Sequence, residues 1–158
     1  MSLILAFVMV LSMTFLTGCG NKQSKQLVVT IEDEKIYLDE AMYYILTTEA
    51  SYDYYYQMIF GPDYWDMELD EGKTLRDITK EGIMNDLIMN EIMYLEGKKA
   101  DIEVPAELND QFKASALEFY NSLPDDIKEL TGLSEPTLLN ITKKSYIASE
   151  YTNGLVED

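Results

Sequence analysis

Residues 74–99, TLRDITKEGIMNDLIMNEIMYLEGKK, decide the fold of this chain. Thr74 and Asp77 have the spacing of a capping box, in which a hydroxyl and a carboxylate bind the free N–H groups at a helix start. Gly97 and the two lysines after it are typical of a helix end. Apolar residues recur between them at helical spacing, at Leu75, Ile78, Ile83, Leu87, Ile88, Ile92 and Leu95. The stretch therefore predicts one long amphipathic helix that needs packing partners.

Three further helices are expected after this one. Pro105 stands where a helix begins, because proline at a first helical position loses no hydrogen bond. Gly132 is typical of a helix end, and Ser134 of a helix N-cap. The expected helices cover 106–123, 125–131 and the stretch from Ser134 to about Gly154.

A short hairpin is expected at the start of the domain. Residues 27–31 (LVVTI) and 36–38 (IYL) predict two strands, and the polar residues 32–35 predict the turn between them. A hairpin of this size is marginal when alone, so it must pack against the helices.

The hairpin leads into another long helix. Asp39 has the position of an N-cap, and the helix should run from Glu40 to about Phe60, where a Gly-Pro pair ends it. One face is apolar, with Met42, Ile45, Leu46, Tyr52, Tyr56, Ile59 and Phe60. The following segment, 63–72, predicts an acidic loop that holds the only tryptophan.

These patterns predict a mainly α domain, a bundle of long helices preceded by a short β-hairpin. The apolar fraction is 47%, which is enough for a buried core. No internal repeat interrupts the order of elements, so one domain over 27–158 is expected.

The charge and residue content exclude several functions. The formal net charge is -17, and the chain has no histidine and one cysteine. Nucleic-acid phosphates and anionic lipid head groups repel such a polyanion, so we expect no nucleic-acid partner. Ser-His and Cys-His catalysis, and most zinc sites, need residue types that are missing. We expect no catalytic residue, no metal and no cofactor in this chain.

The single cysteine, Cys19, follows an apolar run over 3–16. That run is too short to span a bilayer comfortably and has the length of a signal-peptide core. The motif LTGC at 16–19 resembles the lipobox of bacterial lipoproteins. In that family the cysteine thiol receives a diacylglyceryl group and a peptidase cleaves before it, here between Gly18 and Cys19. The chain departs from the family pattern in one respect, because no lysine or arginine precedes the apolar run.

The lipobox resemblance implies three parts. Residues 1–18 would be a lipoprotein signal peptide, 19–26 a lipidated flexible tether, and 27–158 the folded domain. The tether sequence contains no apolar residue after Cys19, which fits its role. The lipid on Cys19 would hold the protein at the extracytoplasmic face of the cell membrane, as in Gram-positive bacteria. A buried structural cysteine or an uncleaved membrane helix is the alternative.

The order of elements resembles the N-terminal domain of the SurA and PrsA foldases, a trigger-factor-like chaperone module. That family has a lysine-rich helix end, an I-x-V step, a proline or serine at the next helix start, and a G-x-S-x-x-x-L opening of the last helix. The matching residues here are Lys98, Lys99, Ala100, Ile102, Val104, Pro105, Gly132, Ser134 and Leu138. The resemblance rests on the order of these motifs together with the lipobox.

The foldase resemblance implies a membrane-anchored chaperone that binds unfolded or partly folded exported polypeptides. Complete foldases of this group usually carry a parvulin peptidyl-prolyl isomerase domain, whose sites use histidines. With no histidine, this chain lacks that domain, so it would be the N-terminal part of a longer isomerase or a module that binds without catalysis. A solute-binding or adhesive lipoprotein with no foldase role is the alternative function.

Aromatic and methionine side chains suit such binding, because they adapt to many partners. The candidate client-binding residues are Tyr43, Tyr44, Tyr54, Tyr55, Tyr64 and Trp65. For each of them, packing in the core between the long helices is the competing interpretation.

Overall fold

The computed structural model describes residues 25–157, and side chains as far as Leu155. The chain is mainly helical, and a short hairpin precedes the first long helix, which confirms the predicted fold class. Strands β1 (Leu27–Ile31) and β2 (Glu34–Tyr37) pair antiparallel, with Thr30 opposite Lys35. The predicted hairpin is therefore present.

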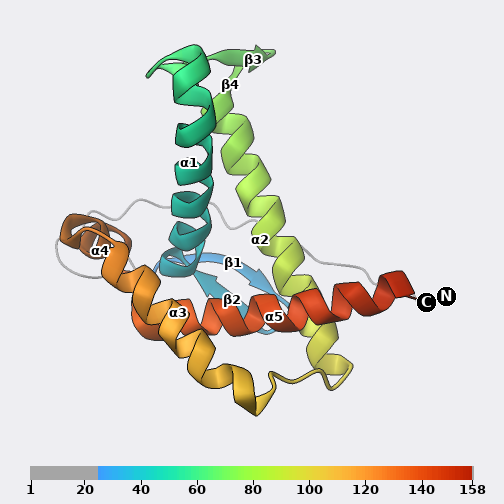
Figure 1. The fold of residues 1–158 in the computed structure, drawn as a ribbon. Coiled ribbons are helices and arrows are strands. Elements are labelled where there is room, and N and C mark those ends of the chain that lie inside the picture. Colours follow the sequence, from blue (N-terminus) through green and yellow to red (C-terminus); the bar gives the residue numbers. More distant parts are fainter. Residues whose placement is uncertain (1–24, 158) are drawn as a thin grey trace.

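Two long helices form an arm that rises from the rest of the molecule (Figure 1). They are α1 (Leu38–Phe60) and α2 (Leu75–Lys99). At the far end of the arm the chain forms a 3-10 turn and a small hairpin, η2 (Tyr64–Asp66), β3 (Glu68–Asp70) and β4 (Lys73–Thr74). The acidic segment 63–72, expected as a loop, thus contains regular structure, and we call residues 49–81 the arm end.

The start of α2 agrees with the prediction from the sequence, whereas the start of α1 does not. The backbone N–H of Asp77 donates to Thr74 Oγ1 at 3.2 Å, and that of Thr74 donates to the Asp77 carboxylate at 3.1 Å, which completes the capping box. The expectation that Asp39 caps α1 is wrong, because the helix begins at Leu38, two residues before the expected Glu40, and its N-cap is Tyr37. Asp39 lies in the first turn, where its carboxylate accepts a hydrogen bond from Thr137 Oγ1 at 3.0 Å.

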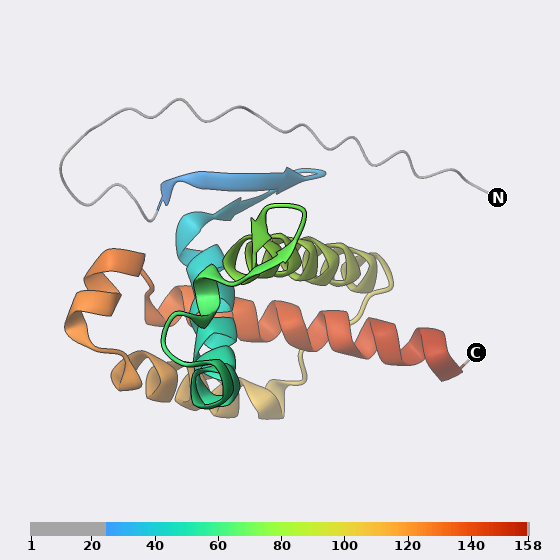
Figure 2. The ribbon, with the colours of Figure 1, turned by 90° about the horizontal axis from the view of Figure 1, so that it is seen from above.

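The remaining helices form the base of the molecule. They are η3 (Ala106–Leu108), α3 (Asn109–Ser122), α4 (Asp125–Thr131) and α5 (Glu135–Glu157). Seen along the arm, the β1–β2 hairpin, α2, α5 and α3 follow one another in layers (Figure 2). Gly132 ends α4 at φ 68°, and Ser134 Oγ accepts from the Thr137 N–H at 3.3 Å, so both predicted boundary residues are confirmed.

Helices α2 and α5 pack closely at Gly97. A Cβ atom at this position would lie 2.7 Å from Cγ2 of Ile147 and 3.4 Å from Cβ of Tyr151. The expectation that Gly97 ends the helix is wrong, because α2 continues to Lys99 and Gly97 is buried inside it. The glycine is needed because the two helices approach closely there.

Two buried clusters form the core of the base. One lies between the β1–β2 hairpin, α1 and α2, and consists of Ile36, Ala41 and Leu87, with Val28, Val29, Ile31, Tyr44 and Ile88 around them. The other lies among α1, α3 and α5, and consists of Ala116, Leu133 and Leu138, with Tyr43, Leu46, Phe119, Tyr120, Leu123 and Leu139 around them. The first half of α1 is thus held by the core, whereas its second half extends into the arm.

Candidate functional site

The inner face of α1 packs against the connection at the arm end. Tyr52 stacks on Trp65 with ring centroids 5.7 Å apart, and Tyr56 stacks on Tyr64 at 5.9 Å. Tyr64 is 1% exposed, and its hydroxyl donates a hydrogen bond to Asp53. Burial raises the pKa of Tyr64, and the Asp53 carboxylate raises it further. We call Tyr52, Tyr56, Tyr64 and Trp65 the aromatic cluster. It forms a small separate core that holds η2, and the β3–β4 hairpin after it, against α1.

The outer face of α1 has no such cover. Tyr54, Tyr55, Met58 and Ile59 are 72%, 65%, 83% and 70% exposed. Their i, i+1, i+4, i+5 spacing places them on one face of the helix. We call these four residues the outer patch. A helix that is apolar on both sides usually lies inside a protein, yet this one borders solvent along the outer patch.

The apolar surface continues around the arm end. Phe60 is 52% exposed although its ring stacks on Tyr56. On β3 and just before it, Leu69 and Met67 are 53% and 36% exposed. Exposed large apolar side chains thus gather at one end of the molecule, which is typical of an interaction site.

The arm end is also acidic. Residues 49–81 contain nine acidic and three basic residues. Two of the three cations have carboxylate partners, because Lys73 pairs with Glu81 at 2.7 Å and Arg76 with Asp66 at 3.5 Å. By contrast, three exposed acidic side chains make no hydrogen bond or ion pair within the described part of the chain, namely Asp63, Asp70 and Glu71. A negative field therefore surrounds the apolar surface.

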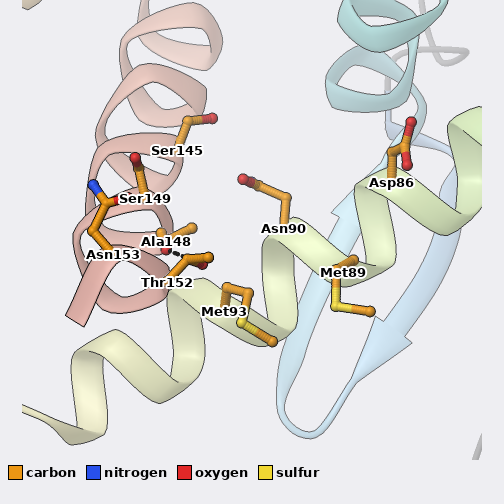
Figure 3. Close-up of a pocket in the computed structure, with 9 residues that line it drawn as sticks. All are labelled: Asp86, Met89, Asn90, Met93, Ser145, Ala148, Ser149, Thr152 and Asn153. Atoms are coloured by element: carbon orange, nitrogen blue, oxygen red, sulfur yellow. Dashed lines mark hydrogen bonds between the residues drawn. The ribbon is translucent and has the colours of Figure 1, made fainter. Parts of the chain in front are cut away.

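A hollow of about 330 Å³ lies between α2 and α5 (Figure 3). Its lining combines a carboxylate, amides, hydroxyls and two thioethers, from Asp86, Met89, Asn90, Met93, Ser145, Ala148, Ser149, Thr152 and Asn153. Asn90 Nδ2 donates a hydrogen bond to the Tyr44 hydroxyl at 3.2 Å. The lining carries both donors and acceptors, so the hollow suits a neutral polar group.

Three charged side chains meet at the junction between the arm and the base. Lys144 of α5 donates to Glu91 Oε2 at 2.9 Å and to Glu40 Oε1 at 3.1 Å. Glu40 lies on α1 and Glu91 on α2, so the ammonium group joins all three long helices. All three residues are buried, and Glu91 Oε1 has no hydrogen-bond partner among the described residues. We call this group the charged triad.

The triad contains one more carboxylate than ammonium groups. Burial raises the pKa of Glu40, and the nearby Lys144 opposes this change without reversing it. Burial also disfavours the charged form of Lys144, but its bonds to Glu91 and the charge of Glu40 outweigh this and raise its pKa. The arrangement therefore favours the charged form of Lys144, and it makes Glu40 bind a proton more tightly than an exposed glutamate does.

Two of the predicted client-binding residues lie in the base. The Tyr43 ring packs edge-on against Phe119, with centroids 5.3 Å apart, and belongs to the core among α1, α3 and α5. Tyr44 packs against the other core cluster, and burial raises its pKa to about 12. Both side chains are partly buried and lie apart from the arm end.

The other four candidates lie at the arm end, in two different environments. Tyr54 and Tyr55 belong to the outer patch and are mostly exposed. Tyr64 is buried in the aromatic cluster, and Trp65 is partly buried beside it, with the Arg76 guanidinium 5.8 Å from its ring centroid. The structure thus brings two of the six to an open surface, and it uses the others for packing.

Sequence reasoning missed Met58 and Ile59 as surface residues, and it missed the charged triad. The predicted apolar face of α1 includes Ile59, whose side chain is 70% exposed. One signal could have shown that Met58 and Ile59 lie at the surface. Beyond Ser51, α1 is apolar around most of its circumference, and a helix that packs on one side only cannot bury all of these side chains. Glu91 and Lys144 carried no local signal, because charged residues on helices are usually exposed.

The lipidation residue Cys19 and the cleavage position after Gly18 lie outside the described residues. The division of the chain at residues 18 and 26 stays a prediction. Within 25–157, no helix has the length and apolar character that crossing a membrane requires. In the same part of the chain, no group of acidic, histidine or cysteine side chains is arranged to hold a metal ion.

Comparison with known proteins gives no assignment. No protein-family model matches the chain, and no curated protein or solved structure matches it significantly. Functional inference therefore rests on the residues and the geometry of this structure.

Proposed function

We propose that this chain is a membrane-anchored, extracytoplasmic chaperone module that binds unfolded exported polypeptides at its arm end. The outer patch is the observation that carries the proposal, because four large apolar side chains on one helix face are mostly exposed. The outer patch lies on one helix of the projecting arm (Figure 1), and its side chains are mostly exposed. Such a surface suits an extended chain better than a small solute.

The physical basis of binding is burial of apolar surface. Fully covering one large apolar side chain contributes about 1.5–3 kcal/mol. A client would cover the four side chains of the outer patch only in part, and ordering the client costs free energy. The net affinity is therefore modest. Weak, adaptable binding is what a chaperone needs, because the client must leave in order to fold. Such binding competes with aggregation and requires no chemical step.

The membrane anchor is the second part of the proposal. It rests on the lipobox resemblance at 16–19 and on the polar residues 20–26 that follow. A lipid on Cys19 would keep the arm close to the membrane, where exported chains emerge unfolded. The module would then act alone or as the N-terminal part of a longer peptidyl-prolyl isomerase.

Suppression of aggregation tests the function. The full chain would be placed in phosphatidylcholine vesicles, and light scattering of a chemically denatured test protein would be followed after dilution. The variant Met58→Ser/Ile59→Ser removes apolar surface from the outer patch. The matched control is Leu117→Ser/Leu130→Ser, which removes two leucines that are 42% and 61% exposed on the base.

We expect the unmodified chain and the control variant to reduce scattering to a similar extent, and the patch variant to lose most of this effect. Equal protection by both variants would contradict the role of the outer patch. Absence of protection by the unmodified chain would contradict the chaperone function itself. All four substitutions lie at exposed positions, so the fold should be retained, and far-UV circular dichroism checks this.

The hollow between α2 and α5 supports a second candidate, a solute-binding lipoprotein. Its volume of about 330 Å³ and its polar lining fit a small neutral solute. The variant Asn90→Leu/Ser149→Leu would fill the hollow with apolar groups. If amino acids or sugars raise the melting temperature of the unmodified chain but not of this variant, the solute-binding function is favoured.

A further inference from the structure

We infer that the arm end selects client segments that are both apolar and cationic, such as stretches in which Lys or Arg alternates with Leu, Ile or Phe. The inference deepens the proposed function and rests on it, because it names the class of polypeptide that the arm end binds. Its basis is that the apolar outer patch and an excess of carboxylates occupy the same end of the molecule.

The carboxylates lie where a bound segment would reach them. Asp63, Asp70 and Glu71 are exposed and belong to the connection that directly follows the outer patch in the chain. A segment lying along the outer patch would extend past the end of α1 toward this connection (Figure 1). Cationic side chains of the segment would pair with these carboxylates while its apolar side chains cover the patch.

Aromatic rings at the arm end would also favour cations. The molecule already uses this interaction, because the guanidinium of Arg76 lies 5.8 Å from the centroid of the Trp65 ring. Tyr54 and Tyr55 meet edge to face, with centroids 5.1 Å apart, and both are mostly exposed. A lysine or arginine placed over either ring would gain a similar attraction.

Charge disfavours the other occupants of the patch. A second copy of the chain carries the same acidic arm end and a net charge of -17, so pairing two patches brings like charges together. Anionic lipid is repelled for the same reason. The apolar run 3–16 of the chain itself contains no cation, so it leaves the carboxylates without partners.

The single tryptophan provides a direct readout. Trp65 belongs to the aromatic cluster on the inner face of α1, the helix that carries the outer patch, and the chain has no other tryptophan. Peptides without tryptophan would be titrated against the full chain in phosphatidylcholine vesicles, with Trp65 emission as the signal. Three peptides share one pattern of Leu, Ile and Phe, and carry Lys, Ser or Glu at the positions between them.

We expect the lysine peptide to bind about tenfold more tightly than the serine peptide at low salt, and the glutamate peptide to bind most weakly. The advantage of the lysine peptide should shrink in 0.5 M salt, where the screening length falls to about 4 Å. The variant Asp63→Asn/Asp70→Asn/Glu71→Gln should bind the lysine peptide about as weakly as the serine peptide, with the affinity for the serine peptide unchanged. Leu117→Ser/Leu130→Ser should alter none of these affinities.

The outcomes separate the two proposals. Equal binding of all three peptides, abolished by Met58→Ser/Ile59→Ser, would overturn the selection for cations and leave the chaperone function standing. Binding of no peptide would overturn both. A concentration-dependent dimer in sedimentation, lost in the patch variant, would identify a second copy as the occupant. Quenching of Trp65 by lipids with brominated acyl chains would identify the membrane instead, and each of these results would overturn the inference.

Discussion

Lys144 links the three long helices where the arm meets the base. It is 5% exposed, and its ammonium group lies between carboxylates from two other helices. A buried charge of this kind contributes little net stability compared with an apolar group, but its partners become costly when it is removed. The triad therefore fixes how α1, α2 and α5 meet more than it adds to the free energy of folding.

The imbalance of the triad predicts unequal effects of two substitutions. Lys144→Met leaves Glu40 and Glu91 buried without a cation, so we expect the free energy of unfolding to fall by about 3–5 kcal/mol. Glu40→Gln leaves a balanced pair of Lys144 and Glu91, so it should cost only about 1 kcal/mol. Urea denaturation measures both. Equal losses would show that Lys144 is no more important for stability than Glu40.

The raised pKa of Glu40 predicts a pH dependence of stability. The folded chain binds a proton on Glu40 more tightly than the unfolded chain does. This binding therefore stabilises the fold fully below pH 4.5, the ordinary pKa, and the stabilisation is lost as the pH rises through the pKa of the folded chain. We expect Glu40→Gln to remove this part of the decline in melting temperature above pH 4.5. Asp63→Asn, at an exposed position, serves as the control and should leave the decline unchanged. A steeper decline in Glu40→Gln would contradict the direction of the shift.

At the scale of elements, Gly97 decides how closely α2 and α5 pack. Alanine inside a helix is usually more stable than glycine by about 1 kcal/mol. At Gly97 the added Cβ would lie 2.7 Å from Ile147 Cγ2 and 3.0 Å from its carbonyl oxygen, so we expect Gly97→Ala to destabilise the protein by about 1–3 kcal/mol.

Gly82, in the same helix, is the matched control. A Cβ there meets nothing within 4 Å, so Gly82→Ala should stabilise the protein by about 0.5–1 kcal/mol. Thermal unfolding followed by circular dichroism compares the two variants. A stabilising Gly97→Ala would contradict the close packing of α2 on α5.

Most ends of helices could be predicted from local sequence patterns. The capping box at Thr74 and Asp77, the left-handed Gly132 and the Ser134 cap involve only neighbouring residues, and all three are present as predicted. The role of Gly97 could not be predicted, because a glycine before two lysines has the same sequence pattern whether it ends a helix or allows a close approach. Only the position of α5 distinguishes these two roles.

The candidate site was less accessible to sequence reasoning, because it depends on which helix faces find a partner. Tyr52 and Tyr54 are two residues apart on α1, yet one stacks on Trp65 and the other is 72% exposed. The difference arises from where η2 folds back, which no local pattern specifies. The charged triad has the same origin, because its members are separated by 51 and 53 positions along the chain.

At the scale of the whole molecule, the chain separates a packed base from a projecting arm. The two core clusters and the charged triad hold the base together, whereas the aromatic cluster provides the buried contacts of the arm end. This division lets the outer patch stay open without weakening the main core. The proposed lipid anchor would then hold the molecule at the membrane while the arm stays available to clients.

The anchor has its own test. Cys19→Ser removes the thiol that lipidation requires, so we expect the variant to leave the membrane fraction when cells are separated by centrifugation. Ser24→Ala, in the proposed tether, should remain in that fraction. Retention of Cys19→Ser at the membrane would show that something other than a lipid on Cys19 holds the protein there.

Amide hydrogen exchange tests the central claim most directly, because it locates client binding along the backbone. The full chain in phosphatidylcholine vesicles would be measured with and without a permanently unfolded test polypeptide, and peptide fragments would be compared. We predict slower exchange over residues 51–66, with no change over α4 at 125–131. Slower exchange confined to 86–93 and 145–153, which line the hollow, or no change anywhere, would contradict polypeptide binding at the arm end.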